Sequence, residues 1–132
     1  MLFLDTSGLF MLFNQKQPQH LLARYYFEIA TRRFTHSYVL SEFVALALAR
    51  NLPRIASLAF IQKIATHKAV QIEWVTHDLH HQALNLLQLQ LDKSYSLCDA
   101  VSFVWMKQMG IRDALTTDHH FIQAGFVRLL EI

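Results

Sequence analysis

The stretch MLFLDTSGLF, residues 1–10, decides the fold because it puts an apolar run directly before an acid. Residues 1–4 form a short, fully apolar segment of the kind that lies inside a parallel sheet, where both faces are covered. Asp5 ends this predicted strand, and residues 6–13 are predicted to form a short helix. A buried strand that leads at once into a helix is typical of α/β proteins.

Outward from this stretch, the chain alternates between strand-like and helix-like segments. Further strands are predicted at 33–37, 70–75, 113–117 and 126–130, and further helices at 20–33, 37–50, 53–67, 76–91, 96–110 and 118–124. Such alternation implies right-handed crossovers between parallel strands. We therefore predict an α/β fold with a parallel central sheet of four to five strands flanked by helices, in three α/β/α layers.

Residues suited to helix ends mark several of these boundaries. Ser37, Thr76 and Ser96 are predicted N-caps, because a hydroxyl oxygen can accept a hydrogen bond from a free backbone N–H of the first turn. Pro53 fits the first turn of a helix, and Gly110 fits a helix end.

Composition sets the class of protein. The chain has 132 residues, of which 53% are hydrophobic and 17% charged, so we expect one packed domain over residues 1–132. No apolar run reaches the roughly 18 residues of a membrane helix, and we predict a soluble, cytoplasmic protein. The lone cysteine, Cys98, excludes an internal disulfide and a zinc site built on several thiolates.

Four acids occupy positions where α/β proteins carry their chemistry. Asp5 and Asp118 follow predicted strands, and the carboxyl ends of parallel strands line the ligand crevice. Asp99 lies in the first turn of a helix, and Glu42 is expected in an apolar setting within another. Converging carboxylates repel one another, and Mg²⁺ or Mn²⁺ would resolve that repulsion. Spacing alone leaves helix capping equally open for the three aspartates.

Charge around these acids is basic. Twelve Lys and Arg stand against ten Asp and Glu, and without the four acids the balance is +6. A basic surface around an acidic pocket suits a polyanionic substrate, although an ordinary soluble surface has a similar balance. Five basic residues lie near the acidic segments and are predicted to contact phosphates: Lys93, Lys107, Arg112, His119 and His120. For the two histidines, a catalytic or metal role and a plain surface or helix-start role both stay open.

The stretches LFLDTSGLF, VLSEFVALALAR, SYSLCDAVSFVWMKQMGI and ALTTDHHFIQAGFVRLL resemble, in this order, the motifs of the PIN-domain family. The family's compact members include the VapC-like toxins of type II toxin–antitoxin modules. The similarity runs along nearly the whole chain, and all four acidic positions are filled. Cys98 beside Asp99 departs from many relatives, and we interpret it as a small buried side chain.

The resemblance implies a metal-dependent ribonuclease that hydrolyses RNA phosphodiester bonds with Mg²⁺ or Mn²⁺. Asp5, Asp99 and Asp118 would be metal ligands, directly or through water, and Glu42 would hold a metal water or act as general base. Thr6 and Thr116 would orient the carboxylates. Whether one or two ions bind stays open. The resemblance also implies a cognate antitoxin, which covers a groove of early helices, and a homodimer.

Other classes fit less well. A phosphoacceptor receiver domain carries a pair of adjacent acids after its first strand, but no second acid adjoins Asp5. A haloacid-dehalogenase-type phosphatase carries Asp-x-Asp, but Ser7 stands two residues after Asp5. The alternative that remains is a catalytically silent module of the same fold that binds RNA or protein.

Overall fold

A computed structural model describes residues 1–131, which build one five-stranded sheet and seven helices. The strands are β1 (Leu2–Leu4), β2 (Arg33–His36), β3 (Val70–Glu73), β4 (Asp113–Leu115) and β5 (Val127–Arg128). The helices are α1 (Thr6–Phe13), α2 (His20–Ile29), α3 (Ser37–Ala49), α4 (Arg54–Thr66), α5 (His77–Leu89), α6 (Leu97–Met109) and α7 (His120–Gln123). The predicted α/β class is confirmed, and the order of elements follows the predicted alternation.

All strand pairs are parallel, and the strand order is β3-β2-β1-β4-β5. The order reverses at β1, which pairs with β2 on one side and with β4 on the other. In open parallel sheets such a switch point leaves a crevice at the carboxyl ends of the two central strands. The topology therefore predicts a ligand site where β1 and β4 end.

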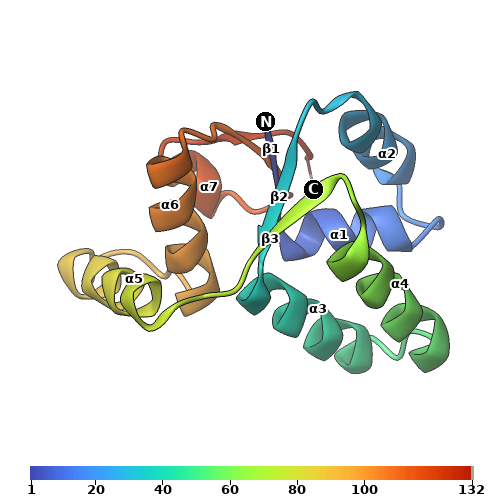
Figure 1. Cartoon of the computed structure of the whole chain (residues 1–132), viewed down its shortest axis with the longest axis horizontal. Coiled ribbons are helices and arrows are strands. Elements are labelled where there is room, and N and C mark those ends of the chain that lie inside the picture. The colour runs from blue at the N-terminus through green and yellow to red at the C-terminus, as the bar shows by residue number, and fades with distance from the viewer. Residues whose placement is uncertain (132) are drawn as a thin grey trace.

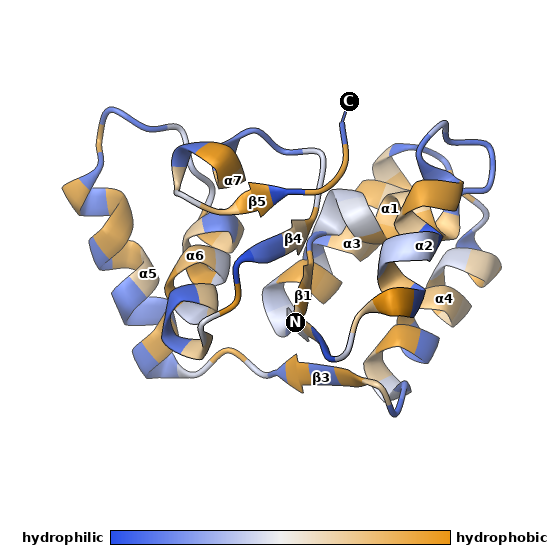
Figure 2. Ribbon diagram, turned by 90° about the horizontal axis from the view of Figure 1, so that it is seen from above, coloured by the Kyte–Doolittle hydropathy of each residue, from blue (hydrophilic) through white to orange (hydrophobic). Residues whose placement is uncertain are grey.

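Helices cover both faces of the sheet. Helices α1 to α4 lie on one side, and α5, α6 and α7 lie on the other (Figure 1). Figure 2 shows apolar residues along β1 and on the helices, whereas the connecting loops are mostly hydrophilic. Among residues 1–131, no helix is long and apolar enough to cross a membrane.

The core is built around β1, whose three residues are all apolar and buried. Phe3 on β1 is fully buried, and its ring packs against Trp105 of α6 and Phe121 of α7. Phe34 on β2 is likewise buried and contacts Trp105 edge-on. A strand with no exposed residue needs apolar side chains on both faces, which explains why residues 2–4 do not alternate with polar ones.

Local sequence signals locate most helix ends correctly. Ser96 caps α6 through a reciprocal capping box with Asp99, Thr76 caps α5, and Gly110 ends α6 with a φ of 71°. Ser37 was predicted to cap α3 and does not. His36 accepts the hydrogen bond from Val39 N instead, whereas Ser37 Oγ accepts from Val75 N at 2.9 Å. Several strands and α2 are also shorter than predicted, as DALTT (113–117) illustrates by forming a strand only over Asp113–Leu115.

Candidate metal centre

The switch point of the sheet has acids after two neighbouring strands. Asp5 follows β1 directly, and Asp118 follows β4 after a short turn. β1 and β4 pair in register, with Leu4 opposite Leu115, so both strands end at the same level. The predicted convergence of these two segments is therefore a consequence of the sheet order.

Asp5 is the most enclosed of the four acids. Its exposure is 5%, and its Oδ2 accepts a hydrogen bond from Thr116 Oγ1 at 2.7 Å. Burial raises the pKa of Asp5 to about 7, and the charges of Asp99 and Glu42 add to the rise, whereas the Thr116 bond lowers it. The carboxyl group is therefore held where its charge is costly unless a cation compensates.

A hydroxyl network fixes the orientation of the Asp5 carboxylate. Thr116 has one hydroxyl proton, which it donates to Asp5, so Ser7 Oγ must donate in its 3.0 Å bond with Thr116 Oγ1. Thr116 Oγ1 also accepts from Asp118 N at 3.0 Å, and Ser7 Oγ accepts from Thr117 N at 2.9 Å. Thr116 thus links the first and last acids, as an orienting group would.

Asp99 combines a capping role with a position in the site. Its Oδ2 accepts from Ser96 N at 3.1 Å, and the same oxygen lies 3.2 Å from His120 Nδ1. Burial raises the pKa of Asp99, and the charge of Asp118 raises it further, whereas the bonds from Ser96 and His120 lower it. Capping and metal binding, which the spacing left as alternatives, are therefore compatible in one side chain.

Asp118 is more exposed than Asp99, with 29% of its side chain accessible against 11%. Its Oδ1 accepts from His120 N at 2.9 Å and lies 3.3 Å from His120 Nδ1. The short turn before α7 therefore bends around this carboxylate.

Glu42 departs from its expected surroundings. It lies on α3 and is exposed, so the expectation of an apolar setting is wrong. The apolar neighbours in the sequence turn toward the core, and Phe43 is fully buried. Burial is the main cause of the raised pKa values of Asp5 and Cys98, and the charge of Glu42 raises both further, so Glu42 still acts on the site.

Cys98 is buried beside the site and stays a thiol. Burial raises its pKa well above the usual range, and the charges of Glu42, Asp5 and Asp99 act in the same direction. A protonated thiol is a poor metal ligand. The structure thus agrees with the interpretation of Cys98 as a small buried side chain.

The five predicted phosphate-contacting residues separate into two groups. His120 touches Asp99 and Asp118, His119 Nδ1 lies 3.8 Å from Asp118 Oδ1, and Lys93 precedes Ser94, whose hydroxyl meets His120. Lys107 lies in the last turn of α6, eight residues or about 12 Å along the helix from Asp99. Arg112 precedes β4 and so lies at the opposite, amino edge of the sheet. Lys107 and Arg112 therefore do not lie near the four acids.

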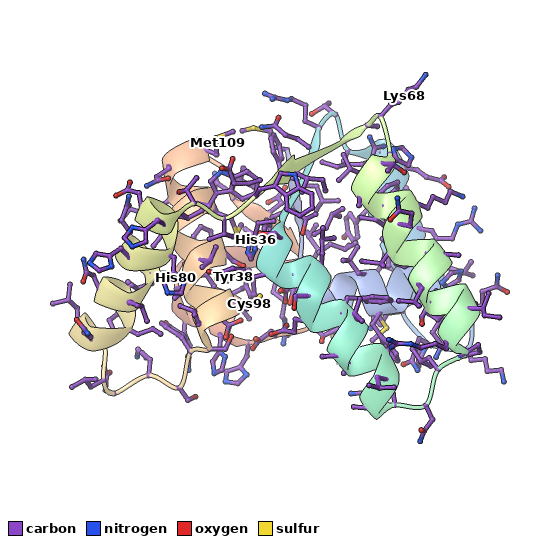
Figure 3. The ribbon with its side chains drawn as sticks, turned by 60° about the horizontal axis from the view of Figure 1, so that its bottom comes forward. His36, Tyr38, Lys68, His80, Cys98 and Met109 are labelled. Atoms are coloured by element: carbon purple, nitrogen blue, oxygen red, sulfur yellow. The ribbon has the colours of Figure 1, made fainter. Side chains whose placement is uncertain are left out.

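His36 is a buried residue that sequence reasoning missed. Its Nδ1 accepts from Val39 N at 3.4 Å, so the ring proton is on Nε2, which donates to Ser102 Oγ at 2.8 Å. Ser102 Oγ donates in turn to the carbonyl of Cys98. Figure 3 shows His36 at the start of α3, on the side of Cys98. The hydrogen bonds from His36 to Ser102 and from Ser102 to Cys98 therefore connect the start of α3 to the first turn of α6. Its position at the end of β2, level with Asp5 after β1, is the signal that could have revealed it.

The donor set fits a hard divalent cation. Asp5, Asp99, Asp118 and Glu42 supply only carboxylate oxygens. Burial, with the charges of neighbouring acids after it, raises the pKa values of Asp5 and Asp99, so a cation would favour their charged forms. Thr6 Oγ1 is buried and forms no hydrogen bond within residues 1–131, which leaves a polar atom beside Asp5 for a water of a bound ion. The cluster Asp118, His119 and His120 also has the spacing of a metal site.

Three comparisons with known proteins agree on the family. The model of the PIN domain matches residues 2–127. The chain is 35% identical over 130 residues to the "23S rRNA-specific endonuclease VapC20" of two Mycobacterium tuberculosis strains, CDC 1551 / Oshkosh and ATCC 25618 / H37Rv, and each alignment covers 98% of both proteins.

A solved structure agrees with the fold along the whole length. The crystal structure of Mycobacterium tuberculosis VapC20, described as a sarcin–ricin loop cleaving toxin, superposes with a TM-score of 0.86 at 33% identity. The match covers 96% of this chain and 97% of that one. The two folds therefore agree over nearly all of both chains.

Proposed function

Since this chain belongs to the PIN-domain family, we propose that it is a VapC-like ribonuclease toxin that hydrolyses RNA phosphodiester bonds with Mg²⁺ or Mn²⁺. The observation that carries the proposal is the coupling of the four acids. Burial is the main cause of the raised pKa values of Asp5 and Asp99. The charges of Asp99 and Glu42 raise the pKa of Asp5 further, and the charge of Asp118 raises that of Asp99, although the four residues come from four separate segments. Repelling carboxylates gathered in one crevice are suited to binding cations.

Asp5, Asp99 and Asp118 would hold the cation, directly or through water. When bound, a divalent ion supplies charge relief for the phosphate oxygens and a water of lowered pKa. Thr116 keeps the Asp5 carboxylate oriented through its 2.7 Å hydrogen bond, and the unbonded hydroxyl of Thr6 is free to orient a water. Glu42 is exposed on α3 and its charge acts on Asp5, so it would take a proton from the attacking water or hold a metal water.

For the substrate, we propose the sarcin–ricin loop of 23S ribosomal RNA. The proposal is supported by the two relatives of 35% identity and by the superposed toxin, whose descriptions state that target. His119 is exposed beside Asp118, and Lys93 is exposed in the loop before α6, next to Ser94, which contacts His120; both are candidates for phosphate contacts. Lys107 and Arg112 are left out of the proposed contact surface, because they lie away from the crevice.

The direct test is cleavage of a synthetic sarcin–ricin loop RNA by purified protein in Mg²⁺ or Mn²⁺. We expect one dominant cut, none in EDTA, and none for Asp118→Asn. An RNA of the same composition without the loop structure is the substrate control. Persistent cleavage in EDTA by a clean preparation would overturn the metal mechanism.

A catalytically silent module of the same fold makes a different prediction. Such a protein would bind RNA without cutting it, and Mn²⁺ would not raise its melting temperature. A ribonuclease with an intact cation site should instead melt at a higher temperature as Mn²⁺ is added. The thermal shift therefore separates the two functions without an RNA substrate.

We also propose a cognate antitoxin that docks on α2 and α4. Three apolar side chains one turn apart along α2 are 56–75% exposed: Leu21, Tyr25 and Ile29. Next to α2, a cavity of about 410 Å³ lies among Leu12, Phe27, Phe60 and Ile64, with charged residues at its rim. An amphipathic helix of a partner would cover such a surface. Co-expression with the product of any small reading frame adjacent to the gene, followed by co-purification, tests this partner. The homodimer and the cytoplasmic location stay predictions.

A further inference from the structure

We propose that His120 is a nitrogen ligand of the divalent cation and biases the site toward Mn²⁺ over Mg²⁺, an inference that rests on the proposed function. Carboxylates alone form an all-oxygen site, which suits Mg²⁺ and Mn²⁺ alike. Imidazole nitrogen suits transition metals better than Mg²⁺, so one histidine in the donor set changes which ion the protein prefers.

The Nδ1 atom of His120 faces two of the acids at once. It lies 3.2 Å from Asp99 Oδ2 and 3.3 Å from Asp118 Oδ1, and these carboxylates come from α6 and from the turn after β4. In an octahedral shell with bonds of about 2.1 Å, neighbouring ligand atoms lie about 3 Å apart. The nitrogen is therefore spaced from both oxygens as neighbouring ligands are.

The other ring nitrogen has the partner that a ligating histidine needs. Metal-binding histidines usually present their second nitrogen to an oxygen, which fixes the tautomer and the ring orientation. His120 Nε2 lies 3.1 Å from Ser94 Oγ, and the ring packs edge-on against Tyr95 at 5.4 Å. Only 16% of the side chain is exposed. The contacts with Ser94 and Tyr95 thus fix the orientation of the ring, and Nδ1 is directed at Asp99 and Asp118.

His119 lacks these features, although it directly precedes His120. Its Nδ1 is 3.8 Å from Asp118 Oδ1, and 62% of its side chain is exposed. Within residues 1–131 its ring forms no hydrogen bond that would fix its orientation. We therefore assign the ligand role to His120 and use His119 as the matched control.

The test needs no activity measurement. Metal-free protein with equimolar Mn²⁺ is measured by pulsed electron paramagnetic resonance, which detects hyperfine coupling from a bound nitrogen. We expect ¹⁴N coupling that changes to ¹⁵N coupling in protein labelled with ¹⁵N-histidine. His120→Asn should lose the coupling, whereas His119→Asn should keep it. Absence of histidine coupling in the unsubstituted protein, or its persistence in His120→Asn, would overturn the assignment.

Calorimetric titrations with Mn²⁺ and with Mg²⁺ measure the predicted preference. His120→Asn should weaken Mn²⁺ binding by about tenfold or more and Mg²⁺ binding by less. Equal weakening of both ions, without nitrogen coupling, would identify His120 as an N–H donor that only positions Asp99 and Asp118.

The failure of this inference differs from a failure of the proposed function. RNA cleavage without histidine coupling would leave the ribonuclease intact and remove His120 from the ligands. Histidine coupling without RNA cleavage would keep His120 as a metal ligand and overturn the proposed ribonuclease activity.

Discussion

A Cβ atom added to Gly8 would lie 1.9 Å from the carbonyl oxygen of Leu115, far inside any real contact distance. Helix α1 therefore packs its backbone directly against the end of β4. Nearby, Asp5 N donates to the same carbonyl at 3.2 Å, and Ser7 bonds to Thr116. The contact between Gly8 and Leu115 sets the distance between Asp5 and Asp118. Gly8 therefore contributes to the site although it touches none of the proposed metal ligands.

We expect Gly8→Ala to lose at least about 3 kcal/mol of unfolding free energy, because backbone atoms on both sides cannot move aside as a side chain would. Urea denaturation of metal-free protein measures this loss. Gly110→Ala is the control: it has open space around it but a φ of 71°, so strain alone should cost about 1 kcal/mol. Equal losses for the two variants would show that α1 can shift away from β4.

Thr116→Val removes the hydroxyl that orients Asp5 and leaves the volume unchanged. Cleavage should fall about 10- to 100-fold, since the Asp5 carboxylate loses its orienting partner. Stability should fall by about 1–3 kcal/mol, because Asp118 N–H loses its acceptor. RNA cleavage rates and chemical denaturation measure the two effects. Thr117→Val, one residue on, should change cleavage little, and an equal drop there would contradict the role of Thr116.

Asp99→Asn should abolish most cleavage, by at least about 100-fold, and leave the protein folded. Asparagine can still accept the bond from Ser96 N that caps α6. Without metal, the variant should melt at a higher temperature, because burial and Asp118 oppose the charge of Asp99. Asp92→Asn, in the exposed loop before α6, should keep full activity. Unchanged cleavage by Asp99→Asn at matched folding and metal would return Asp99 to a plain capping role.

Asp5 should make metal-free protein less stable as the pH rises. Its pKa is about 7 in the folded protein against an ordinary 3.8, so unfolding releases a proton between these values. The free energy of unfolding therefore falls with pH, at about 1.4 kcal/mol per unit. His36 acts oppositely, because burial lowers its pKa from 6.5 to about 3, so that unfolding takes up a proton and stability rises with pH.

The difference between Asp5→Asn and the unsubstituted protein isolates the Asp5 effect from that of His36. This difference in unfolding free energy should grow in favour of the variant from about pH 4 to 7 and then level off. Denaturation in EDTA across this range measures it. A constant difference would mean that Asp5 keeps an ordinary pKa.

Patterns that act within one element were predicted well. The apolar run at residues 2–4 specified a strand buried on both faces, and Ser96 was correctly predicted as the N-cap of α6. Gly110 ended α6 because a residue without Cβ adopts the left-handed conformation at little cost. Each signal involves neighbours in the chain, whose distances are fixed by covalent geometry and helix pitch.

Functional roles that depend on two elements were predicted less well. Lys107 belongs to the same helix as Asp99, yet the rise of that helix carries it to the far end. Glu42 was expected to be enclosed by its apolar neighbours, but these turn to the core and leave it exposed. His36 took the cap expected of Ser37, because Ser37 bonds to the segment after β3 instead.

The sequence by itself determined the strand–helix alternation and the four acidic motifs, because both depend on residues close along the chain. Only the tertiary structure decided that Asp5 and Asp118 follow adjacent strands and that His120 faces Asp99, 21 residues away. The reason is physical: a hydrogen bond or a metal ligand set requires atoms about 3 Å apart. Packing of the helices on both faces of the sheet, including the close approach of Gly8 to Leu115, sets those distances.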